Sequence, residues 1–187
     1  KEAREIAEQL GFCNARKHDS QDICFVPNGD YVKFMEQYTG KQYPAGAFLD
    51  LEGQTVGRHC GAVRYTLGQR KGLGLAMGEP VYVCGKNMAA NTVTVGPENA
   101  LYSSMLLAED MNWISIPQLK QPMRVKAKTR YRQAEQWAAV YPEQHGRVRL
   151  EFDVPQRAVT VGQAVVLYDG DVVVGGGTIC QAPPTKR

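Results

Sequence analysis

The hydrophobic pattern along the chain begins with two stretches of helical spacing. In residues 2–10 the apolar side chains recur at intervals of three and four, and Gly11 follows where a helix would stop. Residues 31–38 repeat this spacing, Asp30 can accept hydrogen bonds from the first turn, and Gly40 can end the helix. The pattern therefore predicts two amphipathic helices joined by an irregular segment.

After Gly40 the pattern changes to short apolar runs separated by turn residues. The strands that we expect span residues 48–51, 54–56, 81–84, 92–95, 124–132, 137–141, 147–154, 164–168 and 171–179. Glu52-Gly53 and Asp169-Gly170 have the composition of hairpin turns. Strands at this regular spacing indicate a small closed barrel. The fold class expected is mainly β with two N-terminal helices.

Shifts in this pattern also predict the domain boundaries. The helical segment covers 1–38, a small central β-rich domain covers 40–104, a β-barrel covers 105–182, and residues 183–187 form a disordered tail. The stretch PENALYSS at 97–104 separates the two β regions.

Composition narrows the class of protein further. The chain has 187 residues, of which 43% are hydrophobic and 22% charged, as is typical of a globular protein of one or two domains. No apolar run approaches the ~20 residues needed to cross a bilayer, so we expect a cytoplasmic protein without a membrane partner. The five cysteines include no CxxC pair, which argues against a metal site or a disulfide framework. Free thiols are expected.

The sharpest charge pattern is a run of cations at every second position. Its members are Arg124, Lys126, Lys128, Arg130 and Arg132. On one strand they would share a face at a spacing of about 6.6 Å, comparable with the step between phosphates of a nucleic acid. The alternative is a salt ladder with a neighbouring strand, on which Glu151 and Asp153 share a face with Arg147 and Arg149. The net charge of +3 does not decide between them.

A second cationic site lies among glycines. Gln69, Arg70 and Lys71 stand between Gly68 and Gly72, where glycine permits tight turns and close approach to a ligand. The spacing matches neither a dinucleotide fingerprint nor a phosphate-binding P-loop. A polar surface turn is the alternative interpretation.

Cys24 is the one cysteine in a polar neighbourhood of mixed charge, KHDSQDICF. Lys17 and His18 would favour its thiolate, whereas Asp19 and Asp22 would oppose it. A buried packing role therefore stays open for Cys24. The other cysteines have the surroundings of packing residues, and we assign His59 and His145 structural roles.

Four blocks together resemble the bacterial tRNA-specific 2-thiouridylases. They are KHDSQDICF, YTLGQRKGLG, KTRYRQ and VTVGQAVVLYDGDVVVGGGTI, at residues 17–25, 65–74, 128–133 and 159–179. The resemblance covers nearly the whole chain. It implies that the chain is the C-terminal part of such an enzyme, without the ATP-pyrophosphatase domain, and that its barrel is similar to the second domain of translation elongation factors.

The resemblance also implies an activity and its residues. Family members replace the C2 oxygen of the wobble uridine, position 34 of tRNA, with sulfur. ATP activates the uridine, and a cysteine persulfide delivers the sulfur. Cys24 matches the persulfide cysteine, and Arg130, Tyr131 and Gln163 match positions that touch tRNA, beside Lys128 and Arg132 of the basic run. Tyr131 has the opposite strand parity to the cations, so its contact with RNA requires a bulge or a strand end near residue 131.

The implied cofactor and partners follow from the same resemblance. ATP with Mg would be bound by the N-terminal domain and no cofactor by this chain, which alone would be inactive. The second catalytic cysteine, which resolves the persulfide through a disulfide, would also lie in that domain. The partners would be tRNA and a sulfur-relay donor protein, while Gln69, Arg70 and Lys71 receive no individual role. A non-catalytic RNA-binding module, with a structural Cys24, is the alternative function, and a protein-docking barrel is a weaker third.

Overall fold

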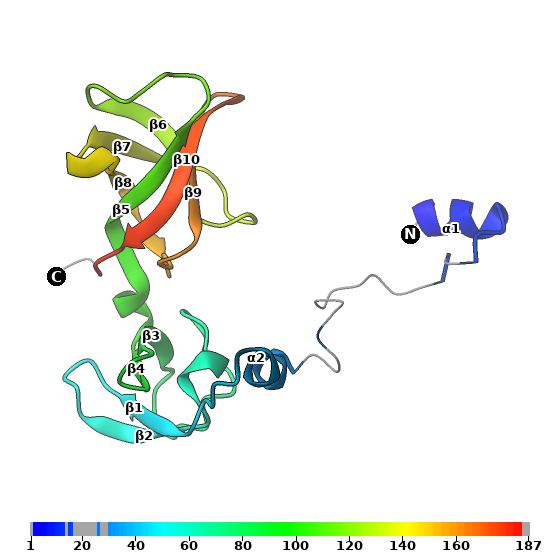
Figure 1. Cartoon of the computed structure of the whole chain (residues 1–187), viewed down its shortest axis with the longest axis vertical. Helices are drawn as coiled ribbons and strands as arrows, with labels where there is room; N and C mark the ends of the chain where they lie inside the picture. The colour runs from blue at the N-terminus through cyan, green and yellow to red at the C-terminus, as the bar shows by residue number, and fades with distance from the viewer. Residues whose placement is uncertain (1, 14, 17–25, 27–29, 185–187) are drawn as a thin grey trace. The chain divides into compact units, whose positions relative to one another are not determined.

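A computed structural model describes residues 2–13, 15–16, 26 and 30–184 of the chain (Figure 1). The chain divides into two compact units, Lys1–Tyr43 and Pro44–Arg187. The first is helical and the second is built from β-strands.

The first unit contains the two predicted helices, α1 (Glu2–Gln9) and α2 (Tyr31–Thr39). A carboxylate oxygen of Asp30 accepts a 3.1 Å hydrogen bond from the amide of Lys33, which satisfies a donor of the first turn of α2. Gly40 ends the helix in the left-handed conformation, with φ of 68°, and its amide donates to the carbonyl of Glu36 at 2.9 Å. The capping residues expected from the sequence of α2 are therefore confirmed.

The second unit begins with a mixed sheet of four strands. Its strands are β1 (Gly46–Leu49), β2 (Thr55–His59), β3 (Tyr82–Asn87) and β4 (Thr92–Gly96), in the order β2-β1-β4-β3. β1 and β4 are parallel, and the other pairs are antiparallel. In the β1–β2 hairpin, the Asp50 carboxylate accepts hydrogen bonds from the amides of Gln54 at 2.7 Å and Glu52 at 3.1 Å. Phe48, Val83 and Val93 are fully buried at the centre of this sheet's core.

Six antiparallel strands then close into a barrel (Figure 1). They are β5 (Tyr102–Trp113), β6 (Met123–Lys128), β7 (Gln136–Pro142), β8 (Val148–Arg157), β9 (Ala164–Asp169) and β10 (Val172–Gln181). Around the barrel their order is β10-β5-β8-β7-β6-β9. Alternate apolar side chains from all six strands fill the interior, and Leu106, Leu150 and Leu167 have no exposed surface.

Short 3₁₀ helices mark some of the connections. They are η2 (Ala62–Arg64), η3 (Glu98–Leu101) and η4 (Gln144–Gly146). η3 leads directly into β5. The two ends of the barrel sequence are also in contact. The Ser103 hydroxyl donates to the carbonyl of Pro183, so the chain after β10 lies against the start of β5.

The predicted fold class is confirmed, but the bounds of several strands differ from the predictions. β5 is the longest strand and was not predicted, because bulges, including one around Asp110 with φ of 51°, interrupt its alternation. β6 ends at Lys128 instead of Arg132. The hairpin turn between β9 and β10 consists of Gly170 and Asp171, one residue later than expected, since Asp169 pairs with Val172.

No helix in the described part of the chain is long and apolar enough to span a bilayer. The cytoplasmic location stays a prediction.

Candidate nucleic-acid interface

The basic run divides into two parts that lie in different surroundings. Arg124, Lys126 and Lys128 belong to β6 and point to its outer face, because Val125 and Ala127 between them are buried in the barrel core. Arg130 and Arg132 follow the end of the strand. The expectation that all five cations share one strand face is therefore wrong for the last two.

Two of the three β6 cations have acidic partners. Arg124 forms a two-pronged ion pair with Asp153, and the Lys128 ammonium lies 3.4 Å from the Glu135 carboxylate. The predicted salt ladder is thus present in part, although β7 stands between β6 and β8. Arg149 pairs with Glu143 and Glu151, which accounts for further charges of β8.

Aromatic rings lie between these cations on the outer face. Arg124 and Lys126 each lie 5.5 Å from the ring centre of Trp137, and Lys128 lies 5.3 Å from that of Tyr168. The register places Lys126 of β6 opposite Trp137 of β7 and Tyr168 of β9. Arg124 and Lys128, two positions away on the same face, reach these rings diagonally. Cation–π contacts of this kind attract the cations to the ring faces.

A hydrogen-bonded turn ends β6. The buried Thr129 hydroxyl donates to the side-chain oxygen of Gln133 at 2.9 Å, and the Gln133 amide donates to the carbonyl of Arg130 at 3.2 Å. The side chain of Gln133 also donates to the buried Gln156 of β8. The bond between the Gln133 amide and the Arg130 carbonyl uses backbone groups that a continued β-ladder would need.

This turn directs Tyr131 into solvent. The tyrosine is 97% exposed and Arg132 beside it is exposed as well. A residue of its parity on a continued strand would have pointed into the barrel. The strand end that contact with RNA requires is therefore present at this position.

Arg130 has the opposite environment and is partly buried. One guanidinium nitrogen, Nη2, donates to the carbonyl of Ala158 at 2.7 Å and contacts the Thr160 hydroxyl at 3.4 Å. Its Nε is buried and lacks a hydrogen-bond partner among the described residues. Gln163 is exposed, its amide donates to the carbonyl of Thr160 at 3.3 Å, and Thr160 thus connects it to Arg130. We call Lys128, Arg130, Tyr131, Arg132 and Gln163 the strand-end cluster.

Two family models match the second unit and part of the first. Residues 32–97 match the tRNA methyl transferase PRC-barrel domain, and residues 103–179 match the aminomethyltransferase beta-barrel domain. Three relatives are named tRNA-specific 2-thiouridylase MnmA. That of Acetivibrio thermocellus is 53% identical over 178 residues, which cover 95% of this chain and 50% of that protein. Those of Heliobacterium modesticaldum and Koribacter versatilis are 51% and 48% identical over 95% and 96% of this chain, and over 47% and 50% of their own lengths.

The chain belongs to the tRNA-specific 2-thiouridylase family. It corresponds to the C-terminal region of these proteins and spans about half the length of the curated relatives that it matches. The resemblance stated from the sequence is confirmed.

The cysteine that the 2-thiouridylase resemblance singles out, Cys24, lies outside the described residues. The four described cysteines are all free thiols: Cys13, Cys60, Cys84 and Cys180. Burial raises the pKa of the Cys84 and Cys180 thiols above the ordinary value, so both are weak nucleophiles at neutral pH.

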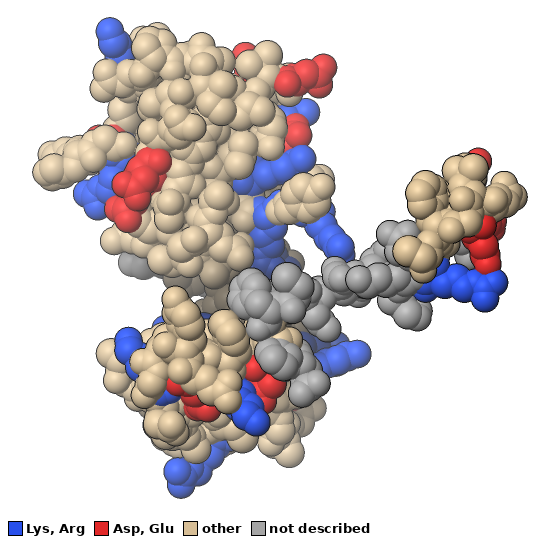
Figure 2. All heavy atoms as spheres, turned by 45° about the vertical axis from the view of Figure 1, so that its right-hand side comes forward, with Lys and Arg blue, Asp and Glu red and all other residues tan. Residues whose placement is uncertain are grey.

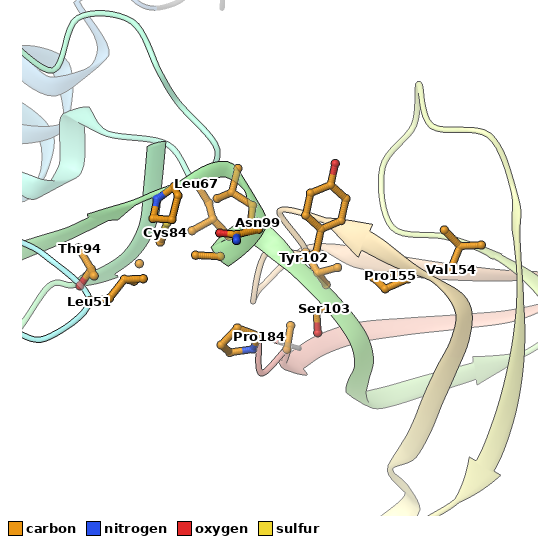
Figure 3. A pocket seen from close by; sticks show the side chains of 16 residues that line it. Leu51, Leu67, Cys84, Thr94, Asn99, Tyr102, Ser103, Val154, Pro155 and Pro184 are labelled. Carbon is orange, nitrogen blue, oxygen red and sulfur yellow. The ribbon is translucent and has the colours of Figure 1, made fainter. Parts of the chain in front are cut away.

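Cys84 lines a hollow of about 890 Å³ between the sheet and the barrel of the second unit. Leu51, Cys84 and Thr94 lie on its sheet side, and Ser103 and Pro155 on its barrel side (Figure 3). None of the described residues that line it is charged.

His59 is structural, as expected. Its ring is 1% exposed, Nδ1 accepts from the amide of Gly61 at 3.0 Å, and Nε2 donates to the carbonyl of Asn91 at 3.1 Å. Both hydrogen bonds are made by the neutral ring, and burial lowers the pKa of His59.

The sequence did not indicate the residues that support the strand-end cluster through hydrogen bonds. Gln133, Gln156, Ala158 and Thr160 supply the hydrogen bonds that shape it. Ala158 adopts φ of 52°, a conformation that alanine rarely takes. The local sequence pattern does not predict this conformation.

Proposed function

We propose that this chain supplies the persulfide cysteine, Cys24, and the tRNA-docking surface of a tRNA 2-thiouridylase. The observation that carries the docking role is the exposed ring of Tyr131 beside Arg132 in the turn that ends β6. An exposed aromatic ring next to cations suits unpaired bases and their phosphates. The names of the relatives, which are 2-thiouridylases specific for tRNA, support this substrate class.

Each member of the strand-end cluster has a proposed part in docking. Tyr131 stacks on a base, while Arg132 and Lys128 attract the backbone. Arg130 and Gln163 complete the surface through the segment at Thr160. Tyr131 supplies stacking energy that salt does not weaken, whereas the cations supply a salt-dependent contribution.

The proposed sulfur transfer proceeds through Cys24. The terminal sulfur of its persulfide attacks C2 of the activated uridine at position 34, so that a C–S bond forms and the activated C–O bond breaks. A second cysteine, outside this chain, then attacks the sulfur of Cys24. The S–S bond to the nucleoside sulfur breaks, a disulfide forms, and 2-thiouridine is released. A thiol reductant reopens the disulfide, and a sulfur-relay donor protein reloads Cys24.

The described residues do not form a recognisable site for the ATP and Mg that would activate the uridine. Across those residues no group of three His, Cys, Asp or Glu side chains is arranged to hold a metal ion. The glycine-rich run at 65–74 lacks the ending of a P-loop. We therefore assign ATP and Mg to a domain outside this chain, and we expect the chain alone to form no 2-thiouridine.

Mass spectrometry of the full-length enzyme tests the role of Cys24. After incubation with a persulfide donor, the wild type should gain one sulfur atom on Cys24. Cys24→Ser should abolish 2-thiouridine formation and leave tRNA affinity unchanged, because a hydroxyl cannot carry a persulfide. Cys60→Ser, at an exposed free thiol, is the matched control and should retain activity.

The alternative function is a non-catalytic RNA-binding module. It would be supported if Cys24→Ser kept full turnover, or if Cys24 took up no sulfur. The failure of the wild type to bind tRNA at low salt would reject both functions.

A further inference from the structure

Two segments that are far apart in the sequence, the glycine-rich loop and the segment behind the strand-end cluster, approach each other in the second unit. A Cβ atom built on Gly68 would lie 3.1 Å from that of Ala158, and 3.2 Å from Nη1 of Arg157. Ala158 is the residue whose carbonyl accepts the hydrogen bond from Arg130. The glycine-rich loop of the sheet domain therefore lies against the segment that supports the strand-end cluster.

The loop is held in a fixed conformation. The Gln69 side chain accepts from the amide of Thr66 at 3.0 Å and donates to the carbonyl of Lys71 at 2.9 Å. Backbone bonds join Gly68 and Gln69 to Val83 of β3 at 2.8 and 2.9 Å. Gln69 is thus a structural residue of the loop, which presents the next two side chains outward.

Those side chains, Arg70 and Lys71, are exposed cations. Neither has an acidic partner in the part of the chain that the structure describes. Their charge is thus available to a ligand, unlike that of Arg124, which is paired with Asp153.

Arg157 also stabilises the contact between the glycine-rich loop and Ala158. Its guanidinium lies 5.5 Å from the ring centre of Tyr82, and its Nε donates to Glu98 at 3.2 Å. The amide of Ala158 donates to the carbonyl of Leu101 at 2.8 Å. Ala158 is therefore fixed through its amide, its carbonyl and its methyl group.

We propose that one RNA-phosphate-binding surface runs from Arg132 on the barrel to Arg70 and Lys71 on the sheet domain, and that Arg130 holds its two parts in register. This inference rests on the proposed tRNA-docking function. Figure 2 shows Lys and Arg side chains gathered over the lower part of the barrel. A polyanion with regularly repeated charges suits cations that project from a rigid loop and a neighbouring turn.

In this arrangement Arg130 is a positioning residue. Its Nη2 is committed to Ala158 and Thr160, and its Nε is buried, so most of its donors do not face solvent. Lysine carries the same charge but cannot make the same paired donation from a planar group. Arg130→Lys should therefore weaken tRNA binding almost as much as Arg130→Ala, while neither changes the salt dependence.

The test measures tRNA affinity of this chain over a series of KCl concentrations. Relative to the wild type, Arg70→Ala/Lys71→Ala should bind at least about tenfold more weakly at 0.1 M salt. Its log–log slope should be shallower by about 1.4 to 1.8, the value for two lost phosphate contacts. Lys120→Ala removes one exposed charge that precedes β6, away from the strand end that bears the cluster. It serves as a control and should change neither quantity.

The outcomes distinguish the extended phosphate-binding surface from the tRNA-docking function on which it rests. If the wild type binds tRNA and the double variant binds with the same affinity and slope, the extended surface is wrong, and an acidic protein becomes the better partner for the loop. If Arg130→Lys restores wild-type affinity, or Arg130→Ala lowers the slope by about one contact, Arg130 binds phosphate directly. A wild type that binds no tRNA overturns the docking function itself.

Discussion

The hydroxyl of Thr129 lies 2.9 Å from the side-chain oxygen of Gln133, and this hydrogen bond closes the turn at which β6 ends. Thr129 is 3% exposed, and removing its hydroxyl leaves the Gln133 oxygen without this partner. Because the same turn exposes Tyr131, the bond joins barrel stability to the proposed docking surface.

We expect Thr129→Val to lower the free energy of unfolding by about 0.5–1.5 kcal/mol, because it removes the hydrogen bond to the partly buried Gln133 side chain. Urea denaturation measures the change. Thr55→Val, at an exposed strand position, should stay within about 0.5 kcal/mol of the wild type. Equal stability of the Thr129 and Thr55 variants would show that the turn does not depend on this bond.

Tyr131→Ala should leave stability unchanged, because the ring is 97% exposed. If the ring stacks on a base, tRNA affinity should fall by about 1–3 kcal/mol and the slope against salt should stay constant. Tyr131→Phe keeps the ring and should bind nearly as well as the wild type. An Ala variant with unchanged affinity would remove Tyr131 from the docking surface.

His59 should make stability depend on pH below neutrality. Burial lowers its pKa in the folded protein, so the unfolded chain takes up a proton first as the pH falls below about 6.5. Stability is therefore complete above that pH and decreases as the pH falls toward the folded pKa. The contribution of His59 to stability therefore shrinks between pH 7 and pH 5.5.

Urea denaturation at both pH values, for the wild type and His59→Gln, isolates this contribution. The variant should be less stable at pH 7 but should lose less stability on acidification. His145→Asn, at an exposed histidine, should follow the wild type. A His59 variant with the same pH dependence as the wild type would contradict the prediction.

Gly175→Ala should destabilise the barrel by about 1–3 kcal/mol, since a Cβ there would lie 2.6 Å from the carbonyl oxygen of Asn112 on β5. The backbone of β5 cannot move out of the way as easily as a flexible side chain can. Gly85→Ala is the control, because its nearest neighbour, on Thr94, would be at 3.6 Å. Thermal unfolding should separate the two variants, and equal midpoints would mean that β5 and β10 can move apart at little cost.

Local patterns in the sequence determined the elements whose stabilising groups are close along the chain. The capping of α2 by Asp30 and Gly40 involves residues within one helix and was predicted from their spacing. Strand alternation likewise predicted a closed barrel and most of its strands, because burial on one face imposes a period of two. The four quoted blocks were enough to indicate the family.

Only the tertiary structure decided which cations stay available and where the basic strand stops. Asp153 neutralises Arg124 from a strand two places away, and Gln156 of β8 takes part in the turn that ends β6. The approach of Gly68 to Ala158 joins residues ninety positions apart. Such contacts depend on barrel closure and on the packing of the sheet domain. Hydrophobic periodicity cannot predict them, because it indicates only which face of a strand is buried.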